Sequence, residues 1–403
     1  IRDSHGNKMS KSKGNVIDPI DLIDGISLDD LLEKRVGNLM QEHVREDVLK
    51  NTKRDYPDGI DAYGTDALRF TYCALASTGR NINFDMKRIE GYRNFCNKLW
   101  NAARFVMMQV GEENFAKPLE SNQLIDRWLD SLMHQTLARV HQGFNTYRFD
   151  LMANTVHEFI WNEFCGWYLE LAKCILNDDA VSETDKQAVR YHMLKSLERI
   201  LRMMHPMIPF ITEEIWQLIK GQLNIDTDSL MTMPYPKAED YKEDKDALKE
   251  IDWLKAVITA IRNIRGEMNI VPSKKIQLIL SSTNAEDKKL IETFTNYLAQ
   301  LAKVECISWD NAKIDNAAST LVGELTINIP LAGLIDTEAE VQRLEKVIAK
   351  LAKEQEKINK MLGNENFVKN APEAVLNKQR GMLDDVEKKL AAANQQIEEL
   401  SNA

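Results

Sequence analysis

The sequence predicts a mainly α-helical protein with a helical bundle, a small α/β domain and a C-terminal antiparallel coiled-coil hairpin. Three observations support this fold class. Apolar residues recur at helical spacing from about residue 85 to 235, with hardly any strand pattern. Residues 276–280 alternate between apolar and polar, and 305–309 and 325–329 are typical of further strands. Two heptad repeats lie near the end of the chain, at 341–362 and 376–400.

The composition indicates a globular protein of roughly two to four domains. The chain has 403 residues, of which 44% are hydrophobic and 28% charged. No apolar run reaches the about 18 residues of a membrane span, and Ile1 begins no signal-peptide pattern. We therefore expect part of a longer cytoplasmic protein with no membrane partner. The net charge of −10 means that a nucleic-acid partner would need local basic faces.

The cysteines argue against a metal site and against disulfides. The chain has five, an odd number, and they are too scattered for a Cys-x-x-Cys pattern. We predict reduced, mostly buried thiols in a cytosolic protein.

A cationic loop lies near the start of the chain. Its motif consists of Lys8, Met9, Ser10, Lys11 and Ser12. Together with Lys13, the motif packs three ammonium groups and two hydroxyls into six residues, between Gly6 and Gly14. Glycines allow backbone conformations that other residues resist. The loop is suited to binding phosphate oxygens, although a solvated lysine-rich turn has the same composition.

Short helices are expected after this loop. Ser27 is a good N-cap for a helix that carries Asp29 and Asp30 in its first turn. Residues 56–59 indicate a turn, and residues 64–70 open a second helix. Asp66 and Arg69 are three residues apart on this helix, which predicts an ordinary helical ion pair.

The helix at 92–106 has two different faces at 100° per residue. Its apolar arc predicts a bundle core and contains Tyr92, Phe95, Cys96, Leu99, Ala103 and Val106. Its polar arc contains Arg93, Asn97, Asn101 and Arg104, flanked by Asn94 and Lys98. Amides and cations of this kind can bind base edges and phosphates, or can simply be solvated. The residue types alone do not decide between these interpretations.

Further helices are expected at 123–145, 151–176 and 182–205, and from residue 212. The aromatic run at 159–169 is typical of core. Residues 233–249 are predicted to form a charged linker, followed by helices at 247–265 and 286–302. Arg262 and Arg265 share one face of the first of these, where they are either available to phosphate or merely exposed.

The two heptad helices predict an antiparallel hairpin, reversed between Gly363 and Pro372. The first helix carries a stripe of lysines spaced by three and four residues, namely Lys346, Lys350, Lys353, Lys357 and Lys360. Nearby glutamates reduce its charge, so the stripe is either a solvated flank or a surface for an anionic partner.

Several of these motifs resemble one protein family. Residues 8–12 resemble the second signature of class I aminoacyl-tRNA synthetases, and 13–19 narrow the likeness to the valine, isoleucine and leucine group. The string at 205–216 is shared across that group. Residues 93–102 resemble the opening helix of the valine-type anticodon-binding domain. Residues 364–372 resemble the turn of the C-terminal arm in the bacterial valyl-tRNA synthetase family, so the chain resembles the C-terminal portion of that family.

The resemblance implies five parts. Residues 1–35 would be a remnant of the class I catalytic domain that carries the lysine loop, and 36–88 a stem-contact region. Residues 89–236 would form the helical anticodon-binding domain and 237–335 the small α/β domain. Residues 336–403 would form the coiled-coil tRNA-binding arm. The family usually has Asp where this chain has Gly166, which puts a polar contact there in doubt.

The activity implied by the resemblance is ATP-dependent attachment of valine to tRNA-Val. Lys8 and Lys11 would be catalytic, and the motif at 8–12 would bind ATP, with Mg²⁺ expected in the full-length enzyme. No cofactor would be bound tightly to this portion, which we expect to be a monomer. The implied tRNA contacts are Arg93, Asn97, Lys98, Asn101, Arg104, Lys346, Lys350, Lys353, Lys357 and Lys360.

Three alternatives compete with this interpretation. An isoleucine– or leucine–tRNA ligase is disfavoured by the coiled-coil hairpin and by the lack of a terminal cysteine-based zinc site. A non-catalytic tRNA-binding protein would have no use for an ATP-phosphate loop, and a purely structural coiled coil does not explain the first 335 residues. Because no His-x-Gly-His signature is present, we expect this portion alone to be unable to form valyl-adenylate.

Overall fold

The computed structural model describes residues 1–3, 6–37, 39, 44–77, 79, 81–312, 314, 316–331, 334, 337–363 and 373–401. It is mainly α-helical with one small mixed sheet, as predicted. The chain divides into two compact units, Ile1–Ile251 and Asp252–Ala403. The expected hairpin turn lies outside the described residues, except for Gly363.

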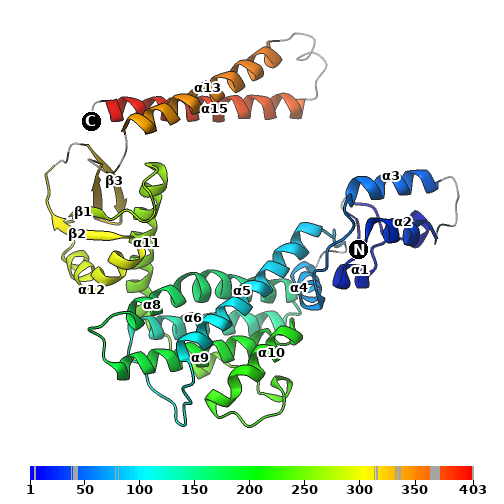
Figure 1. Ribbon diagram of the computed structural model, residues 1–403, viewed down its shortest axis with the longest axis horizontal. Helices are drawn as coiled ribbons and strands as arrows, with labels where there is room; N and C mark the ends of the chain where they lie inside the picture. The colour runs from blue at the N-terminus through cyan, green and yellow to red at the C-terminus, as the bar shows by residue number, and fades with distance from the viewer. Residues whose placement is uncertain are drawn as a thin grey trace. The chain divides into compact units, whose positions relative to one another are not determined.

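The first unit begins with short elements that follow the lysine loop (Figure 1). These are the 3₁₀ turn η1 (Lys11–Lys13) and the helices α1 (Pro19–Asp24), α2 (Leu28–Gly37), α3 (Arg45–Asp55) and α4 (Thr65–Leu75). The predicted Ser27 cap is confirmed, because the Asp30 N–H donates to Ser27 Oγ at 3.2 Å. Helix α3 was not predicted, since its sequence is mostly polar and shows little apolar periodicity.

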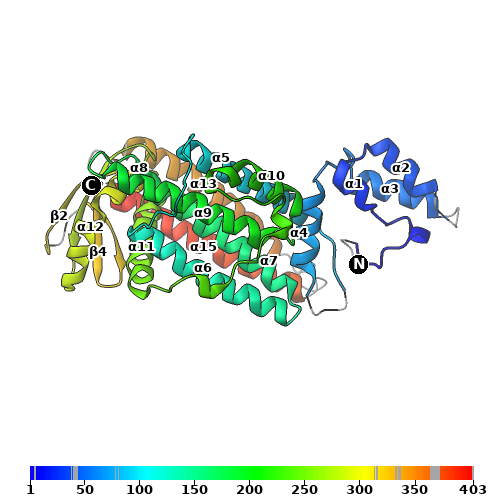
Figure 2. The ribbon, with the colours of Figure 1, turned by 90° about the horizontal axis from the view of Figure 1, so that it is seen from below.

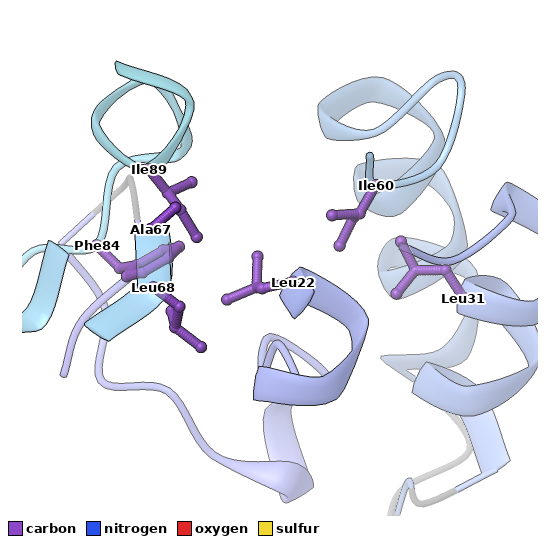
Figure 3. Packing of buried hydrophobic residues seen from close by; sticks show 7 residues of the cluster. All are labelled: Leu22, Leu31, Ile60, Ala67, Leu68, Phe84 and Ile89. Carbon is purple, nitrogen blue, oxygen red and sulfur yellow. The ribbon is translucent and has the colours of Figure 1, made fainter. Parts of the chain in front are cut away.

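A small apolar cluster joins these elements to the start of the bundle (Figure 3). Its buried members are Leu22, Leu31, Ile60, Ala67, Leu68, Phe84 and Ile89. They come from α1, α2, α4, the start of α5 and the segments before α4 and α5, and Figure 3 shows Leu22 pointing between the other side chains. Met9 of the lysine loop packs against the same cluster. The loop is therefore attached to the first helices by an apolar contact.

Gly59 is required where two segments of this region cross. Ile26 and Ile60 exchange two backbone hydrogen bonds of 2.9 Å. Gly59 has φ +83°, and a Cβ there would lie 2.3 Å from the Ile26 carbonyl oxygen. Gly64 has the same positive φ, but a Cβ there would meet no atom within 4 Å.

We predict that Gly59→Ala is more destabilising than Gly64→Ala. Both substitutions strain the backbone, at about 1–3 kcal/mol each. Gly59→Ala adds a clash with the backbone, for about 1–3 kcal/mol more. Urea unfolding of the two variants measures the difference. Equal losses of stability would show that the crossing relaxes to admit the methyl group.

The bundle consists of α5 (Met86–Val110), α6 (Leu124–Asn145), α7 (Phe149–Glu158), α8 (Leu169–Leu176), α9 (Glu183–Met204) and α10 (Pro209–Ile219). Between α7 and α8 the chain forms a ten-residue π-helix, η3 (Phe159–Tyr168). Helix α9 packs against α5 and α10, and α6 packs against α7 and the π-helix (Figures 1 and 2). The predicted core of α5 is confirmed except at Tyr92, which is half-buried, since Phe95, Leu99 and Val106 are fully buried and Cys96 and Ala103 are buried too.

The expected ion pair between Asp66 and Arg69 is replaced by contacts with a distant segment. Asp66 accepts hydrogen bonds from the backbone N–H groups of Phe210 and Ile211, at 3.3 and 2.7 Å, at the start of α10. Arg69 donates to the carbonyls of Pro206 and Met207. Pro206 and Pro209 interrupt the helix, so these backbone groups lack partners within it, and the two side chains of α4 bind them instead. These two side chains therefore hold α4 to the break between α9 and α10.

The predicted linker is folded against α6. Short 3₁₀ turns, η4 (Lys220–Leu223), η5 (Leu230–Thr232) and η6 (Ala238–Asp240), follow α10. His134 and His141 lie within hydrogen-bond distance of the carbonyls of Ala238 and Pro236. Arg127 and Asp244 form an ion pair of 2.7 Å. Because α6 makes these contacts, residues 236–244 are held against it and do not form a free linker.

The second unit contains most of α11 (Lys245–Glu267) and a four-stranded sheet of order β2-β1-β4-β3. The strands are β1 (Ile276–Ser281), β2 (Val304–Trp309), β3 (Ala317–Val322) and β4 (Leu325–Pro330), and α12 (Ala285–Leu301) connects β1 to β2. β1 pairs with β2 in parallel, and the other pairs are antiparallel. Three strands match the prediction. β3 was missed because its small residues show no clear alternation.

The open question about Arg262 and Arg265 is answered by their contacts. Arg265 is 7% exposed and donates to the carbonyls of Val271, Pro272 and Lys274. Arg262 donates to the carbonyl of Leu301. Arg265 therefore holds the loop before β1, and Arg262, which is exposed, binds the end of α12.

The hairpin consists of α13 (Thr337–Leu362) and α15 (Glu373–Ser401), which pack along each other as predicted. Ile358 and Val386 are buried in the seam, and Gln355 donates to Glu387 across it. Among the helices that the structure describes, none combines the length and the apolar character needed to cross a membrane. All five cysteines lie in the described residues, and none forms a disulfide. Cys96 and Cys174 are buried and Cys73 and Cys165 half-buried, whereas Cys306 is exposed, unlike the mostly buried thiols that we expected.

Candidate functional site

The lysine loop is built onto the first residues of the chain and onto the segment before α5. Lys8 pairs with Arg2 in an isolated antiparallel bridge, and Arg2 pairs in parallel with Asn83. The Arg2 N–H donates to the Ile82 carbonyl at 2.7 Å, and the Phe84 N–H donates to the Arg2 carbonyl at 2.9 Å. The Arg2 guanidinium also donates to the Gly6 carbonyl. The base of the loop is therefore hydrogen-bonded to the chain that leads into α5.

The loop presents its two predicted catalytic lysines to solvent. Lys8 and Lys11 are exposed, whereas Met9 and Ser10 are half-buried. Lys11 begins the turn η1, which ends at Gly14 with φ +62° and a Gly14 N–H bond to the Lys11 carbonyl. A Cβ at Gly14 would lie 2.8 Å from Val48 Cγ2, so this position favours glycine for both reasons. Nothing is described of the Ser12 side chain.

Acidic groups near Lys11 are paired with another cation. A cavity of about 320 Å³ is lined by Lys11, Asp18, Asp21 and Lys34, among others. Lys34 Nζ lies 2.8 Å from Asp18 and 2.7 Å from Asp21. The hydrogen bond from Lys34 lowers the pKa of Asp18. Lys34 binds both carboxylates but carries one positive charge against their two negative charges, and the charge of Lys11 also lowers the pKa of Asp18.

The polar side chains of α5 differ in whether they have partners within the protein. Arg93 donates to the Ala62 carbonyl at 3.1 Å and lies over the Tyr63 ring. Lys98 Nζ lies 4.1 Å from the centre of the Trp161 ring, a cation–π distance. Asn97, Asn101 and Arg104 are exposed. Of the arc and its two flanking residues, Arg93 and Lys98 have partners inside the protein, and the other four, which include Asn94, are exposed.

The π-helix extends this surface, and sequence reasoning did not find it. Trp161 stacks on His157 with ring centres 5.7 Å apart and an angle of 11°. Burial lowers the pKa of His157. The Trp161 ring thus has Lys98 and His157 as neighbours. π-Helices are rare, and those that do occur, mostly as single turns inside α-helices, often lie at functional sites. An aromatic run has no sequence signal that separates a π-helix from an α-helix.

A buried charged cluster also escaped the sequence prediction. Tyr168 donates to Asp126 Oδ1 at 2.6 Å, and Ser121 donates to Asp126 Oδ2. His192 Nδ1 lies 3.1 Å from Asp126 Oδ1, and His192 Nε2 lies 3.2 Å from Asp130 Oδ1. Burial alone would lower the pKa of His192, but the two carboxylates outweigh it and raise that pKa to about 10. The cluster joins α6, the π-helix and α9.

The predicted basic stripe is present on α13. Lys346, Lys350, Lys353, Lys357 and Lys360 are all exposed. Lys360 forms an ion pair of 2.6 Å with Glu356, and surface pairs of this kind contribute little to stability. The candidate residues thus belong to three elements of the chain, namely the loop, α5 and α13.

Comparison with known families matches three parts of the chain. Residues 1–85 match the family described as "tRNA synthetases class I (I, L, M and V)". Residues 126–280 match "Anticodon-binding domain of tRNA ligase", a range that does not include α5. Residues 336–401 match "Valyl tRNA synthetase tRNA binding arm".

Two curated relatives are similar over most of the chain. A "Valine--tRNA ligase" of Francisella tularensis subsp. tularensis (strain SCHU S4 / Schu 4) is 49% identical over 93% of this chain and 41% of its own length. A "Valine--tRNA ligase" of Psychrobacter arcticus (strain DSM 17307 / VKM B-2377 / 273-4) is 43% identical over 100% of this chain and 42% of its own length. The chain belongs to the valyl-tRNA synthetase family.

Within the valyl-tRNA synthetase family, the chain corresponds to a portion of the bacterial type. It spans about two fifths of the length of the two relatives. A solved chain from the "Crystal structure of the ternary complex of Agrobacterium radiobacter K84 agnB2 LeuRS-tRNA-LeuAMS" aligns over 80% of this chain and 30% of that chain, with 12% identity. Its TM-score of 0.37 is too low to establish a common fold.

Proposed function

We propose that this chain is the portion of a valine–tRNA ligase that supplies the lysine loop and holds the tRNA. The similarity to two valine–tRNA ligases along nearly the whole chain carries this proposal. The reaction joins valine to ATP as valyl-adenylate with release of pyrophosphate, and then transfers the valyl group to tRNA-Val. Because the chain spans two fifths of those relatives, we propose that it does not form the adenylate by itself.

Lys8 and Lys11 are proposed to act electrostatically on ATP. In-line attack by the valine carboxylate on the α-phosphate increases negative charge on the phosphate oxygens. Exposed ammonium groups on a hydrogen-bonded loop can stabilise that charge, while Met9, Ser10 and Ser12 shape the same ATP loop. Mg²⁺ is expected to accompany ATP in the full-length enzyme.

The α5 arc and the α13 stripe are proposed to bind tRNA-Val. On α5 the set is Arg93, Asn97, Lys98, Asn101 and Arg104, of which Asn97, Asn101 and Arg104 are the most exposed. Amides can read unpaired bases of an anticodon, and Arg104 can neutralise phosphate. The lysine stripe of α13 presents charge without base-reading groups. We further propose a monomer that acts in the cytoplasm, where tRNA and ATP are available.

Two variants of this chain are expected to affect tRNA binding differently. Asn97→Ala with Asn101→Ala removes base contacts, each worth about 1–3 kcal/mol, so the preference for tRNA-Val over a tRNA with changed anticodon should be lost. Lys346→Ala, Lys350→Ala and Lys353→Ala together should weaken both tRNAs equally. They should also lower the salt dependence by up to about 0.9 in slope per phosphate contact. Titration with each tRNA at rising salt measures both effects.

Matched controls keep the test specific. Gln187→Ala removes an exposed amide from α9, and Lys388→Ala removes a lysine of α15 that is paired with Asp384. Both controls should leave tRNA binding unchanged. If the α5 double variant kept its preference for tRNA-Val, the anticodon assignment of this face would be wrong.

A further inference from the structure

The side chain of Asn15 fastens the lysine loop from inside. Asn15 Oδ1 accepts a hydrogen bond from the Ser10 N–H at 2.9 Å. Asn15 Nδ2 donates to Asp3 Oδ2 at 2.9 Å and to the Lys8 carbonyl at 3.3 Å. Asp3 Oδ1 in turn accepts from the Asn7 N–H at 2.8 Å. The side chains of Asn15 and Asp3 thus bind the backbone at Asn7, Lys8 and Ser10, on both sides of Met9.

The contacts require a carboxamide at position 15. One end of the side chain must accept from an N–H, and the other must donate to a carboxylate and a carbonyl. A carboxylate at position 15 could accept from Ser10, but it has no proton to donate to Asp3 and would repel it. The contacts therefore place the amide at position 15 and the carboxylate at position 3.

The loop depends on these bonds because little is packed beneath this side of it. A cavity of about 470 Å³ is lined by Asp3, Asn7, Gly14 and Asn15, together with residues of α2 and α3. On the other side Met9 is seated on the apolar cluster. Lys8 and Lys11 project from a backbone that is shaped by hydrogen bonds more than by packing.

We propose that Asn15, braced by Asp3, is the positioning residue of the lysine loop. It fixes the backbone between Lys8 and Lys11 and so fixes where the two ammonium groups are held during adenylate formation. This inference rests on the proposed function of the loop. A misplacement of about 1 Å can cost about 10²-fold in rate, so a loosened loop should lower turnover even though both lysines remain.

The first test uses the full-length synthetase and valine-dependent ATP–pyrophosphate exchange. Asn15→Ala is expected to lower kcat by about 10- to 100-fold, with the KM for valine nearly unchanged. Asn15→Asp should be at least as damaging. The double variant Asp3→Asn with Asn15→Asp restores a hydrogen bond between positions 3 and 15 but not the donor to the Lys8 carbonyl. It should therefore recover part of the loss of Asn15→Asp, by about 10-fold. If the double variant had an exchange rate no higher than that of Asn15→Asp, the proposal would be overturned.

The second test asks whether Asn15 acts through the lysine. In a Lys8→Ala background, Asn15→Ala should cause less than about a 3-fold further loss, because the two residues work as one unit. An independent, multiplied loss would overturn the proposal. If Lys8→Ala itself left the exchange rate intact, the proposed function of the loop would fail instead, so the two failures are distinguishable.

Controls exclude a general loss of structure. Asn51→Ala removes an exposed amide that lines the same cavity, and it should retain the full exchange rate. Affinity for tRNA-Val should be unchanged in every variant, because the proposed tRNA surfaces lie elsewhere in the chain. If Asn15→Ala does not fold, the comparison of Asn15→Asp with the swapped pair decides the question.

Discussion

Replacing Lys8 or Lys11 by alanine in the full-length synthetase is expected to lower valine-dependent ATP–pyrophosphate exchange by about 10²- to 10³-fold. The reason is that each removes a preorganised positive group from the place where phosphate charge increases, a loss worth about 3–4 kcal/mol of barrier. Both ammonium groups are exposed on a loop whose base is fixed by backbone bonds to Arg2. The KM for valine should change much less than kcat.

Lys13→Ala is the matched control for this prediction. Lys13 is exposed in the same 3₁₀ turn and carries the same charge, but it lies outside the proposed catalytic pair. Its loss should lower the exchange rate by less than about 10-fold. A loss as large as that of Lys8→Ala would mean that the loop acts through its total charge and not through two placed groups. Lys8→Arg should not restore the full rate, because a guanidinium has a different shape.

Removing Asp126 is expected to lower the stability of the bundle strongly. Asp126 is 1% exposed, and it lies beside His192 and accepts from Tyr168. Asp126→Ala would take from the buried imidazolium one of the two carboxylates that stabilise its charge, and breaking a buried pair costs about 3–5 kcal/mol. Asp130→Ala should cost less, since the Asp130 side chain is 35% exposed. Urea unfolding at pH 6 measures both.

The same cluster predicts a pH dependence with a definite sign. The pKa of His192 is raised to about 10 in the folded protein, against 6.5 for an ordinary histidine. The folded state therefore holds a proton that the unfolded state has released between pH 6.5 and about 10. Its contribution to stability is complete below pH 6.5 and is lost as the pH rises toward 10.

The variant His192→Gln provides the check. Its loss of stability relative to the unchanged chain should be largest at pH 6 and should shrink as the pH approaches 10. A difference that is constant over this range would show that His192 is not charged in the folded protein.

Local patterns predicted most of the fold. The heptads at 341–362 and 376–400 specified a hairpin because a repeat of apolar residues needs a partner helix to cover it. The apolar arc of α5 identified Phe95, Leu99 and Val106 as core. The elements that were missed lack such patterns: α3 is mostly polar, and β3 has small residues. The π-helix shares its composition with an ordinary buried helix.

Interactions between distant residues could not be predicted in the same way. Asp66 and Arg69 are spaced as a helical ion pair, yet they bind the break between α9 and α10, about 140 residues away. Asp126 and His192 come from α6 and α9 and meet only because the helices pack. Lys98 was assigned from its helical face, but its cation–π contact with Trp161 depends on the π-helix. A contact between two different elements cannot be recognised from the spacing of residues within either of them.

The sequence by itself determined the family, the fold class and the placement of cations on the loop, on α5 and on α13. These features follow from sequence motifs and from the periodicity of apolar residues within each element, and both are local properties of the chain. Only the tertiary structure decided which of those cations already have partners, how Asn15 and Asp3 fasten the lysine loop, and where a histidine is held charged in the bundle. The physical reason is that a hydrogen bond or a pKa shift depends on distance and burial, and these exist only after the elements pack.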